Sequence, residues 1–218
     1  MARFGVLGTG VVGQSIASKL VSLGHEVTMG SREAGNKKAV DWAAEAGDLA
    51  HEGSFADAAA FGEILVNATA GTATLEVLSQ AGDDALAGKT LLDISNALDF
   101  SRGFPPRLSV ANDDSLAEQI QRAHPAVHVV KTLNTVTADV MVDPSRLPGS
   151  HNIFVSGNDE GAKAQAKDVL TSFGWPDEDV IDLGDLTAAR ALEMYLPLWL
   201  RLMQAGGSPY FNIKVVRP

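Results

Sequence analysis

The sequence predicts an α/β fold, with a doubly wound, mostly parallel sheet followed by a short C-terminal helical extension. Three observations support this class. Apolar strand-like runs alternate with helix-like segments along most of the chain, which is the pattern of βαβ units. A turn with three glycines, Gly8 to Gly13, separates the first strand-like run from the first helix. The length of 218 residues suits one domain of this kind with a small addition.

In the first half of the chain, each expected element has a local reason. Residues 4–7 and 64–66 are short apolar runs, as in strands that are buried on both faces. Apolar residues within 12–23 recur at helical spacing, and Gly24 follows where a helix commonly ends. The segment Ser54–Asp57 has the spacing of a capping box that opens a short helix. The other elements expected here are strands at 26–29 and 90–94 and helices at 37–46 and 74–80.

The second half continues the alternation. Ser115–Glu118 has capping-box spacing at the start of a helix that ends before Pro125. Residues 97–114 form the longest irregular stretch, which is either a functional loop or a surface excursion. Residues 211–215 alternate between apolar and polar side chains, as in an edge strand. The other elements expected here are strands at 128–133, 152–156 and 180–183 and a helix at 160–173.

Composition and charge exclude several classes of function. The chain has 17 basic and 27 acidic side chains, a net charge of −10, and no cysteine. The lack of cysteine excludes a disulfide scaffold, thiolate-bound zinc, iron–sulfur clusters and thiol catalysis. The acidic balance argues against a nucleic-acid partner. No metal-binding motif, signal peptide or membrane span is visible, so we expect a cytoplasmic protein that does not bind membranes.

The glycine turn indicates a Rossmann-type dinucleotide site. It matches the pattern G-x-G-x-x-G between a strand and a helix, and its residues are Gly8, Thr9, Gly10, Val11, Val12 and Gly13. The first glycine permits the tight turn, the second lets the backbone approach a pyrophosphate, and the third lets the helix pack closely against the strand. The pyrophosphate would face free N–H groups and the positive end of the helix dipole. The alternative is a glycine turn without a ligand.

The end of the second strand favours NADP(H) over NAD(H). An NAD site usually carries an acidic residue there, which bonds the ribose 2′-OH. This chain has Ser31 and Arg32 instead, with Lys37 and Lys38 in the following turn. Hydroxyl and guanidinium donors suit a 2′-phosphate, which a carboxylate would repel. The alternative is that Arg32 and the two lysines are solvated surface residues.

Three strand ends define where the reacting rings should lie, because ligands of doubly wound sheets bind beyond the carboxyl ends of the strands. The small residues Ala68, Thr69 and Ala70 would let a cofactor ring lie against the backbone. Asn96 and Asn134 could bond a carboxamide or a second ring. We therefore expect these five residues to face one crevice.

The chain beyond the last expected strand is too short for a second catalytic domain. We divide the chain into an NADP-binding domain at 1–185 and an extension at 186–218, which holds one helix that is apolar on almost all sides. Pro197 should kink this helix. Such a helix must be covered, and we expect a homodimer interface; a second layer of the fold is the alternative. The substrate would bind in a shallow cleft that is roofed by this helix and by loop 97–114, which suits a flat ring.

Four groups of residues carry a resemblance to a known family. They are Gly8-Thr9-Gly10 with Gly30-Ser31-Arg32; Leu133-Asn134-Thr135-Val136; Leu183-Gly184-Asp185-Leu186 with Arg190 and Glu193; and Asn212-Ile213-Lys214-Val215-Val216. These motifs span nearly the whole chain and resemble those of the coenzyme F420-dependent NADP reductases. The resemblance implies that Ser31 and Arg32 hold the 2′-phosphate. It also implies direct hydride transfer between NADPH and a deazaflavin, without a catalytic side chain.

The second substrate stays open at this point. The chain departs from the archaeal reductases at Asn134, where they carry histidine, and at Asp93–Ala97, where they are rich in valine and proline. Coenzyme F420, FMN and FAD are therefore all candidate acceptors. A small imine or keto-acid reductase with Lys131 as the acid–base group is a second hypothesis, and a surface lysine is the plain alternative for that residue. A third hypothesis is a protein that binds NADP as a sensor, without chemistry.

Overall fold

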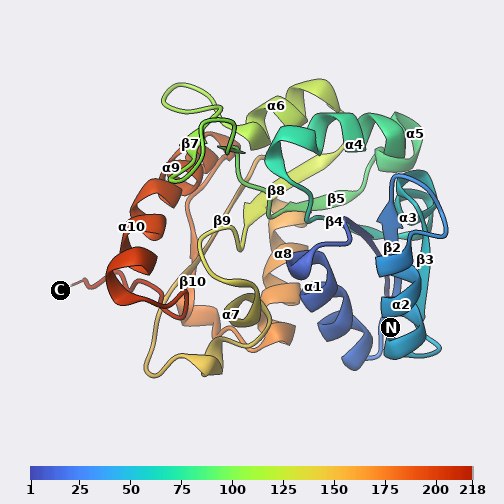
Figure 1. Cartoon of the computed structure of the whole chain (residues 1–218), viewed down its shortest axis with the longest axis horizontal. Helices are drawn as coiled ribbons and strands as arrows, with labels where there is room; N and C mark the ends of the chain where they lie inside the picture. Colours follow the sequence, from blue (N-terminus) through green and yellow to red (C-terminus); the bar gives the residue numbers. More distant parts are fainter. Residues whose placement is uncertain (218) are drawn as a thin grey trace.

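The computed structural model describes residues 1–217, and Pro218, the last residue of the expected extension, lies outside them. One eight-stranded sheet forms the centre of the molecule, with helices on both faces (Figure 1). Its strands are β1 (Arg3–Leu7), β2 (Glu26–Ser31), β3 (Ala50–Ser54), β4 (Ile64–Asn67), β5 (Thr90–Asp93), β8 (His128–Thr132), β9 (Ile153–Gly157) and β10 (Val180–Asp182). Strands β6 (Leu98–Asp99) and β7 (Arg107–Leu108) form a separate hairpin.

The strand order confirms the predicted doubly wound, mostly parallel sheet. The order is β10-β9-β8-β5-β4-β1-β2-β3, and the six strands from β8 to β3 run parallel to one another. This six-strand arrangement, with the first strand in the interior, is typical of dinucleotide-binding folds. Strand β9 is antiparallel to β8, and the short edge strand β10 is parallel to β9. The carboxyl ends of the six parallel strands therefore meet along one edge of the sheet.

Two hydrophobic clusters, one on each face of the sheet, form the core. Val6 points into one cluster and Leu7 into the other, because successive side chains of a strand alternate between faces. The first face is covered by α1 (Val11–Ser22), α2 (Lys37–Ala46), α7 (Ala138–Val142) and α8 (Glu160–Phe173). The second face is covered by α3 (Phe55–Phe61), α4 (Thr74–Ala81), α5 (Asp83–Leu86), α6 (Leu116–Ala123) and α9 (Ala189–Met194).

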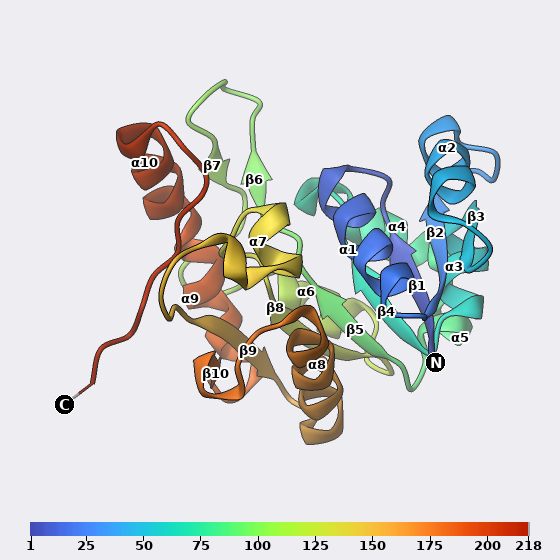
Figure 2. The same cartoon turned by 90° about the horizontal axis from the view of Figure 1, so that it is seen from below.

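The C-terminal helix differs from the prediction in how much of it is covered. It is interrupted at Tyr195, which separates α9 from α10 (Leu196–Gly206). Pro197 lies just after the interruption and has no N–H to bond the Glu193 carbonyl, which agrees with the predicted kink. Helix α9 packs on the sheet, but Leu198 in α10 is 55% exposed, so only part of the helix is buried within one chain. Figure 2 shows α10 and the β6–β7 hairpin projecting from the same edge of the sheet.

Two strand assignments are corrected by the structure. Strand β3 is not predicted, because its sequence has no apolar run and only Ala50 and Gly53 are buried. The edge strand expected at 211–215 is wrong. The Asn152 N–H donates to the Ile213 carbonyl at 2.9 Å, but the neighbouring bonds use the Asn152 and Asn212 side chains, so no backbone ladder forms. Among residues 1–217, no helix has the length and hydropathy needed to span a bilayer.

Candidate active site

The turn between β1 and α1 has the geometry that its glycines predict. Gly8 has a φ of +119°, a region that other residues rarely adopt. A Cβ at Gly13 would lie 2.2 Å from the Gly8 carbonyl oxygen, so only glycine permits this approach of helix and strand. Gly10 precedes α1 without a side-chain cap, and the space where its Cβ would lie is open. The first N–H groups of α1 therefore lack intrahelical partners and fit a pyrophosphate.

A first cavity, of about 250 Å³, extends from this turn to the end of β2. Arg32 lines it and is exposed to solvent. Within the described residues its guanidinium has no hydrogen bond or ion pair, unlike Arg190, which binds both carboxylate oxygens of Glu118 at 2.8 and 2.6 Å. An unpaired guanidinium fits a 2′-phosphate because its planar fork can donate two parallel N–H bonds to phosphate oxygens.

The other three residues predicted to hold the 2′-phosphate do not line the first cavity. Ser31 is 4% exposed, and its Oγ donates to the Glu33 carbonyl at 2.5 Å. The Lys37 Nζ lies 2.7 Å from Asp41 Oδ2 in an exposed ion pair, and Lys38 is exposed at the start of α2. The two lysines are therefore solvent-exposed and lie outside the first cavity.

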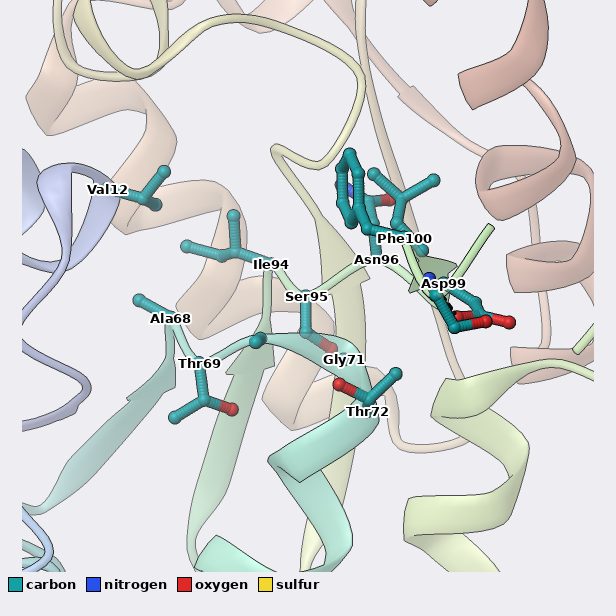
Figure 3. A pocket seen from close by; sticks show the side chains of 13 residues that line it. Val12, Ala68, Thr69, Gly71, Thr72, Ile94, Ser95, Asn96, Asp99 and Phe100 are labelled. Carbon is teal, nitrogen blue, oxygen red and sulfur yellow. Dashed lines mark hydrogen bonds between the residues drawn. The ribbon is translucent and has the colours of Figure 1, made fainter. Parts of the chain in front are cut away.

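A second cavity, of about 500 Å³, adjoins the first. The two share Ala68, Thr69 and Ala70 as a common wall. Figure 3 shows Val12 on one side of the second cavity and Phe100 on the other. The shared wall thus consists of the three small residues over which the sequence leads us to expect a flat ring to lie. Val11, by contrast, is 75% exposed and lines neither cavity.

Loop 97–114 contributes one wall of the second cavity through the β6–β7 hairpin. The Asp99 carboxylate accepts the Ser101 N–H at 2.8 Å and the Arg107 Nε–H at 2.7 Å. These bonds lower the pKa of Asp99 to about 2, and the bond from the Ser101 backbone has the largest effect. Between these anchors Phe100 is 57% exposed and lines the cavity. The hairpin thus presents an aromatic face on a braced turn, which supports the functional interpretation of this loop.

The two predicted asparagines lie together but play unequal parts. Asn96 lines the second cavity, whereas Asn134 is 3% exposed and lies behind it. The Asn134 Nδ2 donates to Asn96 Oδ1 and to the Leu192 carbonyl, each at 3.0 Å. Asn96 is therefore the one of the two that lines the cavity; its own Nδ2 donates to the Asn134 carbonyl at 3.3 Å, so Asn134 holds it against α9.

Lys131 lies beneath the second cavity and does not line it. Its side chain is fully buried, and its ammonium contacts Asp93 Oδ2 at 2.8 Å, Glu193 Oε1 at 3.3 Å and the Ser95 carbonyl. These three acceptors match the three donors of an ammonium. Burial lowers the pKa of Lys131, but the two carboxylates outweigh it and raise the pKa overall. The surface alternative is wrong, because the ammonium is fully buried, hydrogen-bonded to Asp93 and Ser95 and ion-paired with Glu193.

Two contributors to this site are not predicted from the sequence. Phe100 offers a weak signal, a lone aromatic residue in a long irregular stretch. Asp93 offers a clearer one, because a carboxylate directly after the apolar run Leu91–Leu92 of a parallel strand must find a buried partner. The sequence around Asp93 does not identify this partner, which is Lys131 in strand β8.

Residues 3–97 match the family described as NADP oxidoreductase, coenzyme F420-dependent. A crystal structure from Arthrobacter sp. FB24, named provisionally as an F420-dependent NADP reductase, is 49% identical with a TM-score of 0.94. That similarity covers 100% of both chains.

Two further relatives are more distant. Metalloreductase STEAP3 of Rattus norvegicus is 29% identical over 201 residues, which make up 90% of this chain and 38% of that protein. The chain therefore spans well under half the length of this relative. A reductive aminase from Aspergillus terreus, solved with NADPH and ethyl levulinate, has a TM-score of 0.67 and is 22% identical. The matched region covers 94% of this chain and 63% of the aminase chain. At that identity the likeness shows the fold alone.

Proposed function

Because the chain belongs to the family of coenzyme F420-dependent NADP oxidoreductases, we propose that it transfers a hydride between NADP(H) and a planar deazaflavin or flavin. The observation that carries this proposal is the pair of adjoining cavities with their shared wall at Ala68–Ala70. One cavity contains the glycine turn and Arg32, and the other is lined by small residues and Phe100. A dinucleotide laid across the shared wall would have its phosphates in the first cavity and its nicotinamide in the second.

Binding and orientation are the work of the protein in this proposal. NADPH supplies the hydride, and with one proton from solvent the acceptor gains two electrons and becomes reduced. The backbone of Gly8–Gly10 would hold the pyrophosphate, and Arg32 the 2′-phosphate. Val12, Ile94 and Phe100 would enclose the stacked rings and exclude water. Holding two reactants at reacting distance can supply much of the rate acceleration without an acid–base side chain.

The acceptor class follows from the shape of the second cavity. A volume of about 500 Å³ admits a flat polycyclic ring beside a nicotinamide. Phe100 offers a ring face for offset stacking. Coenzyme F420, FMN and FAD all present such a ring, and the family membership favours F420 among them.

An acceptor screen tests this function. Purified protein would be mixed with NADPH and, in separate reactions, coenzyme F420, FMN, FAD and a quinone, and NADPH absorbance would be followed. We expect turnover with at least one ring acceptor and much slower turnover with NADH. Tight NADPH binding without turnover on any acceptor would contradict the proposal and favour the sensor hypothesis.

Reduction of a small imine or keto acid by Lys131 is less well supported. That hypothesis needs a proton on a group that touches the substrate. The Lys131 ammonium is fully buried, lines neither cavity, and is hydrogen-bonded to Asp93 and Ser95 and ion-paired with Glu193. Adding a keto acid or an imine to the screen would decide between the two functions, since only the Lys131 reductase hypothesis predicts turnover with these substrates.

We also propose a homodimer that is formed through α10. Met194, Leu198 and Leu202 follow one another at helical spacing and are 38%, 55% and 39% exposed. A two-fold axis would place two copies of this apolar face against each other. Light scattering coupled to size-exclusion chromatography should give twice the chain mass of 22.9 kDa, and Leu198→Lys should give the monomer. A monomeric wild-type protein would refute the dimer without touching the proposed reaction.

A further inference from the structure

A buried network of charged side chains lies beneath the second cavity. Asp93 and Lys131 are fully buried, and Glu193 is 1% exposed. A buried ion pair is often no more stabilising than well-packed apolar residues of the same volume. Stability alone is therefore a poor explanation for two carboxylates and an ammonium at this place, and the contacts they make indicate another role.

Asp93 connects the two loops that line the second cavity. Its Oδ1 accepts the Asn67 Nδ2–H and the Ser95 hydroxyl, each at 2.7 Å. Asn67 Oδ1 in turn accepts the Thr69 hydroxyl at 2.7 Å. Thr69 and Ser95 both line the cavity. One carboxylate thus sets the distance between the shared wall and the loop that follows β5.

Lys131 and Glu193 tie these loops to the C-terminal part of the fold. The Lys131 ammonium binds Asp93, the Ser95 carbonyl and Glu193. The Glu193 carboxylate also accepts the N–H groups of Leu116 at 2.8 Å and Ala117 at 3.2 Å, at the start of α6. The same network therefore spans the β4 and β5 loops, strand β8, helix α6 and helix α9.

We infer that Asp93, Lys131 and Glu193 are positioning residues, which hold the walls of the second cavity at the separation that hydride transfer requires. This inference rests on the proposed function, since it concerns the alignment of the two rings. The network touches neither ring: it acts through Thr69 and through Ser95, whose neighbour Asn96 also faces the cavity. Supporting contacts of this kind matter because a displacement of about 1 Å at a reacting centre can lower the rate about a hundredfold.

Three variants separate a positioning role from proton transfer and from a purely stabilising role. Lys131→Met removes the ammonium at similar size, and Lys131→Arg keeps a buried cation with several donors. Lys163→Met is the matched control, since Lys163 is 4% exposed and bonded to two carboxylates, Glu160 at 2.8 Å and Asp182 at 3.2 Å, but lines neither cavity. Turnover at saturating NADPH and acceptor, the Kd of NADPH, the melting temperature and backbone hydrogen exchange would be measured for each.

For Lys131→Met we expect kcat to fall between about tenfold and about a hundredfold, with the NADPH Kd changed by less than about threefold. The amides of Thr69 and Ser95, which donate to Asn67 and Asp93, should exchange faster than in wild type, while α1 should not. Lys131→Arg should recover most of kcat. Lys163→Met should lower the melting temperature and leave both kcat and these amides unchanged.

Three other results would overturn the inference. One is a Lys131→Met enzyme with wild-type kcat and unchanged exchange at Thr69 and Ser95. Another is equal loss of kcat in Lys131→Met and Lys131→Arg together with a lost limb of the pH profile, which would indicate proton transfer. The third is an equal effect of Lys163→Met on kcat. If Lys131→Met does not fold, Glu193→Gln takes its place, and we expect changes in the same direction. If the wild-type protein reduces no acceptor, the proposed function fails, but the exchange data still show whether the network holds the loops at Thr69 and Ser95.

Discussion

The two adjoining cavities differ in what holds their walls. In the first, the groups proposed to hold the cofactor phosphates are the turn Gly8–Gly13 and an exposed guanidinium that is free of protein partners within residues 1–217, while Phe55 and residues of α4 complete the lining. In the second, the walls are held by buried side chains from distant segments of the chain. Lys131 and Asp93, for example, are hydrogen-bonded to each other and lie 38 positions apart. Cofactor affinity is thus a local property of the chain, whereas ring alignment is a tertiary one. Substitutions should therefore separate affinity from turnover.

The largest effect should come from breaking the turn itself. In Gly13→Val the side chain would meet the Gly8 carbonyl oxygen, which lies 2.2 Å from an added Cβ. We expect α1 to shift, the melting temperature to fall by several degrees, and NADPH affinity to fall by about a hundredfold or more. Thermal denaturation and NADPH fluorescence titration would measure both. Wild-type affinity in this variant would show that the turn is not the pyrophosphate site.

Gly10→Val is the matched control for that change. The space at its Cβ is open, so we expect the melting temperature of wild type. Affinity for NADPH should still fall, because the new side chain would occupy the path by which the pyrophosphate approaches the backbone. Loss of stability in Gly10→Val would mean that the two glycines cannot be distinguished in this way.

Arg32→Ala should have the next largest effect, and only on one cofactor. Charge-assisted hydrogen bonds contribute about 1.5–3 kcal/mol, which corresponds to an affinity loss of about ten- to a hundredfold for NADPH. NADH, which has no 2′-phosphate, should bind as to wild type. Lys37→Ala is the control, because that lysine is paired with Asp41 outside the cavity. An equal loss of both cofactors in Arg32→Ala would contradict the assignment.

Phe100→Ala should weaken the binding of the ring acceptor in the second cavity. Removing an aromatic stacking partner costs about 0.5–1.5 kcal/mol, so the KM for the ring acceptor should rise up to about tenfold. The NADPH Kd should change much less, since the groups proposed to hold the phosphates of NADPH lie in the first cavity, which Phe100 does not line. Phe104 is 54% exposed and lines neither cavity, so Phe104→Ala serves as the control. If both variants raise the KM equally, the hairpin acts as a whole and not through one ring.

The smallest effect concerns the start of α6, which supports the second cavity. Asp114 accepts two bonds from Arg122, at 3.0 and 2.8 Å, and its pKa is lowered from 3.8 to about 2, mainly by this guanidinium. Because the folded pKa is depressed, the stabilisation is present above about pH 4 and disappears as the pH falls through about 2. The Arg122 side chain is 60% exposed, so solvent screens the pair and its contribution to stability is small.

Melting temperatures of wild type and Asp114→Asn, measured between about pH 6 and about pH 2, would check this dependence. We expect a small deficit for the variant at the upper end and none at the lower end. A deficit that is constant across the range would mean that Asp114 acts through packing and not through its charge.

Elements with local signals could be predicted from the sequence. The capping box at Ser54–Asp57 is present with both of its bonds, at 2.9 and 3.1 Å. Helix α8 spans Glu160–Phe173, the bounds that the pattern predicts. In the site, the turn and Arg32 could be predicted as well, because their chemistry is contained in neighbouring residues. Strand β3 has no such signal and forms because β2 offers it a backbone ladder.

The second cavity could be predicted only in part, for a physical reason. The small residues Ala68–Ala70 and the end of β5 follow from the rule that ligands bind at the carboxyl ends of strands. The partner of Lys131 does not, since its sequence neighbours Val130 and Thr132 say nothing of a carboxylate in α9. For the C-terminal helix the sequence predicts that it is covered but leaves a dimer interface and a second layer of the fold as alternatives, because an apolar helix has the same sequence whether its own chain or a partner covers it.

The short edge strand β10 has a consequence for how the molecule behaves in solution. Edge strands carry unpaired backbone groups that can recruit another chain. Here that edge is only Val180–Asp182, and it is bordered by Asp177 and Glu178. So short an edge, with charged residues beside it, offers another chain few backbone groups to pair with, which limits sheet-to-sheet aggregation.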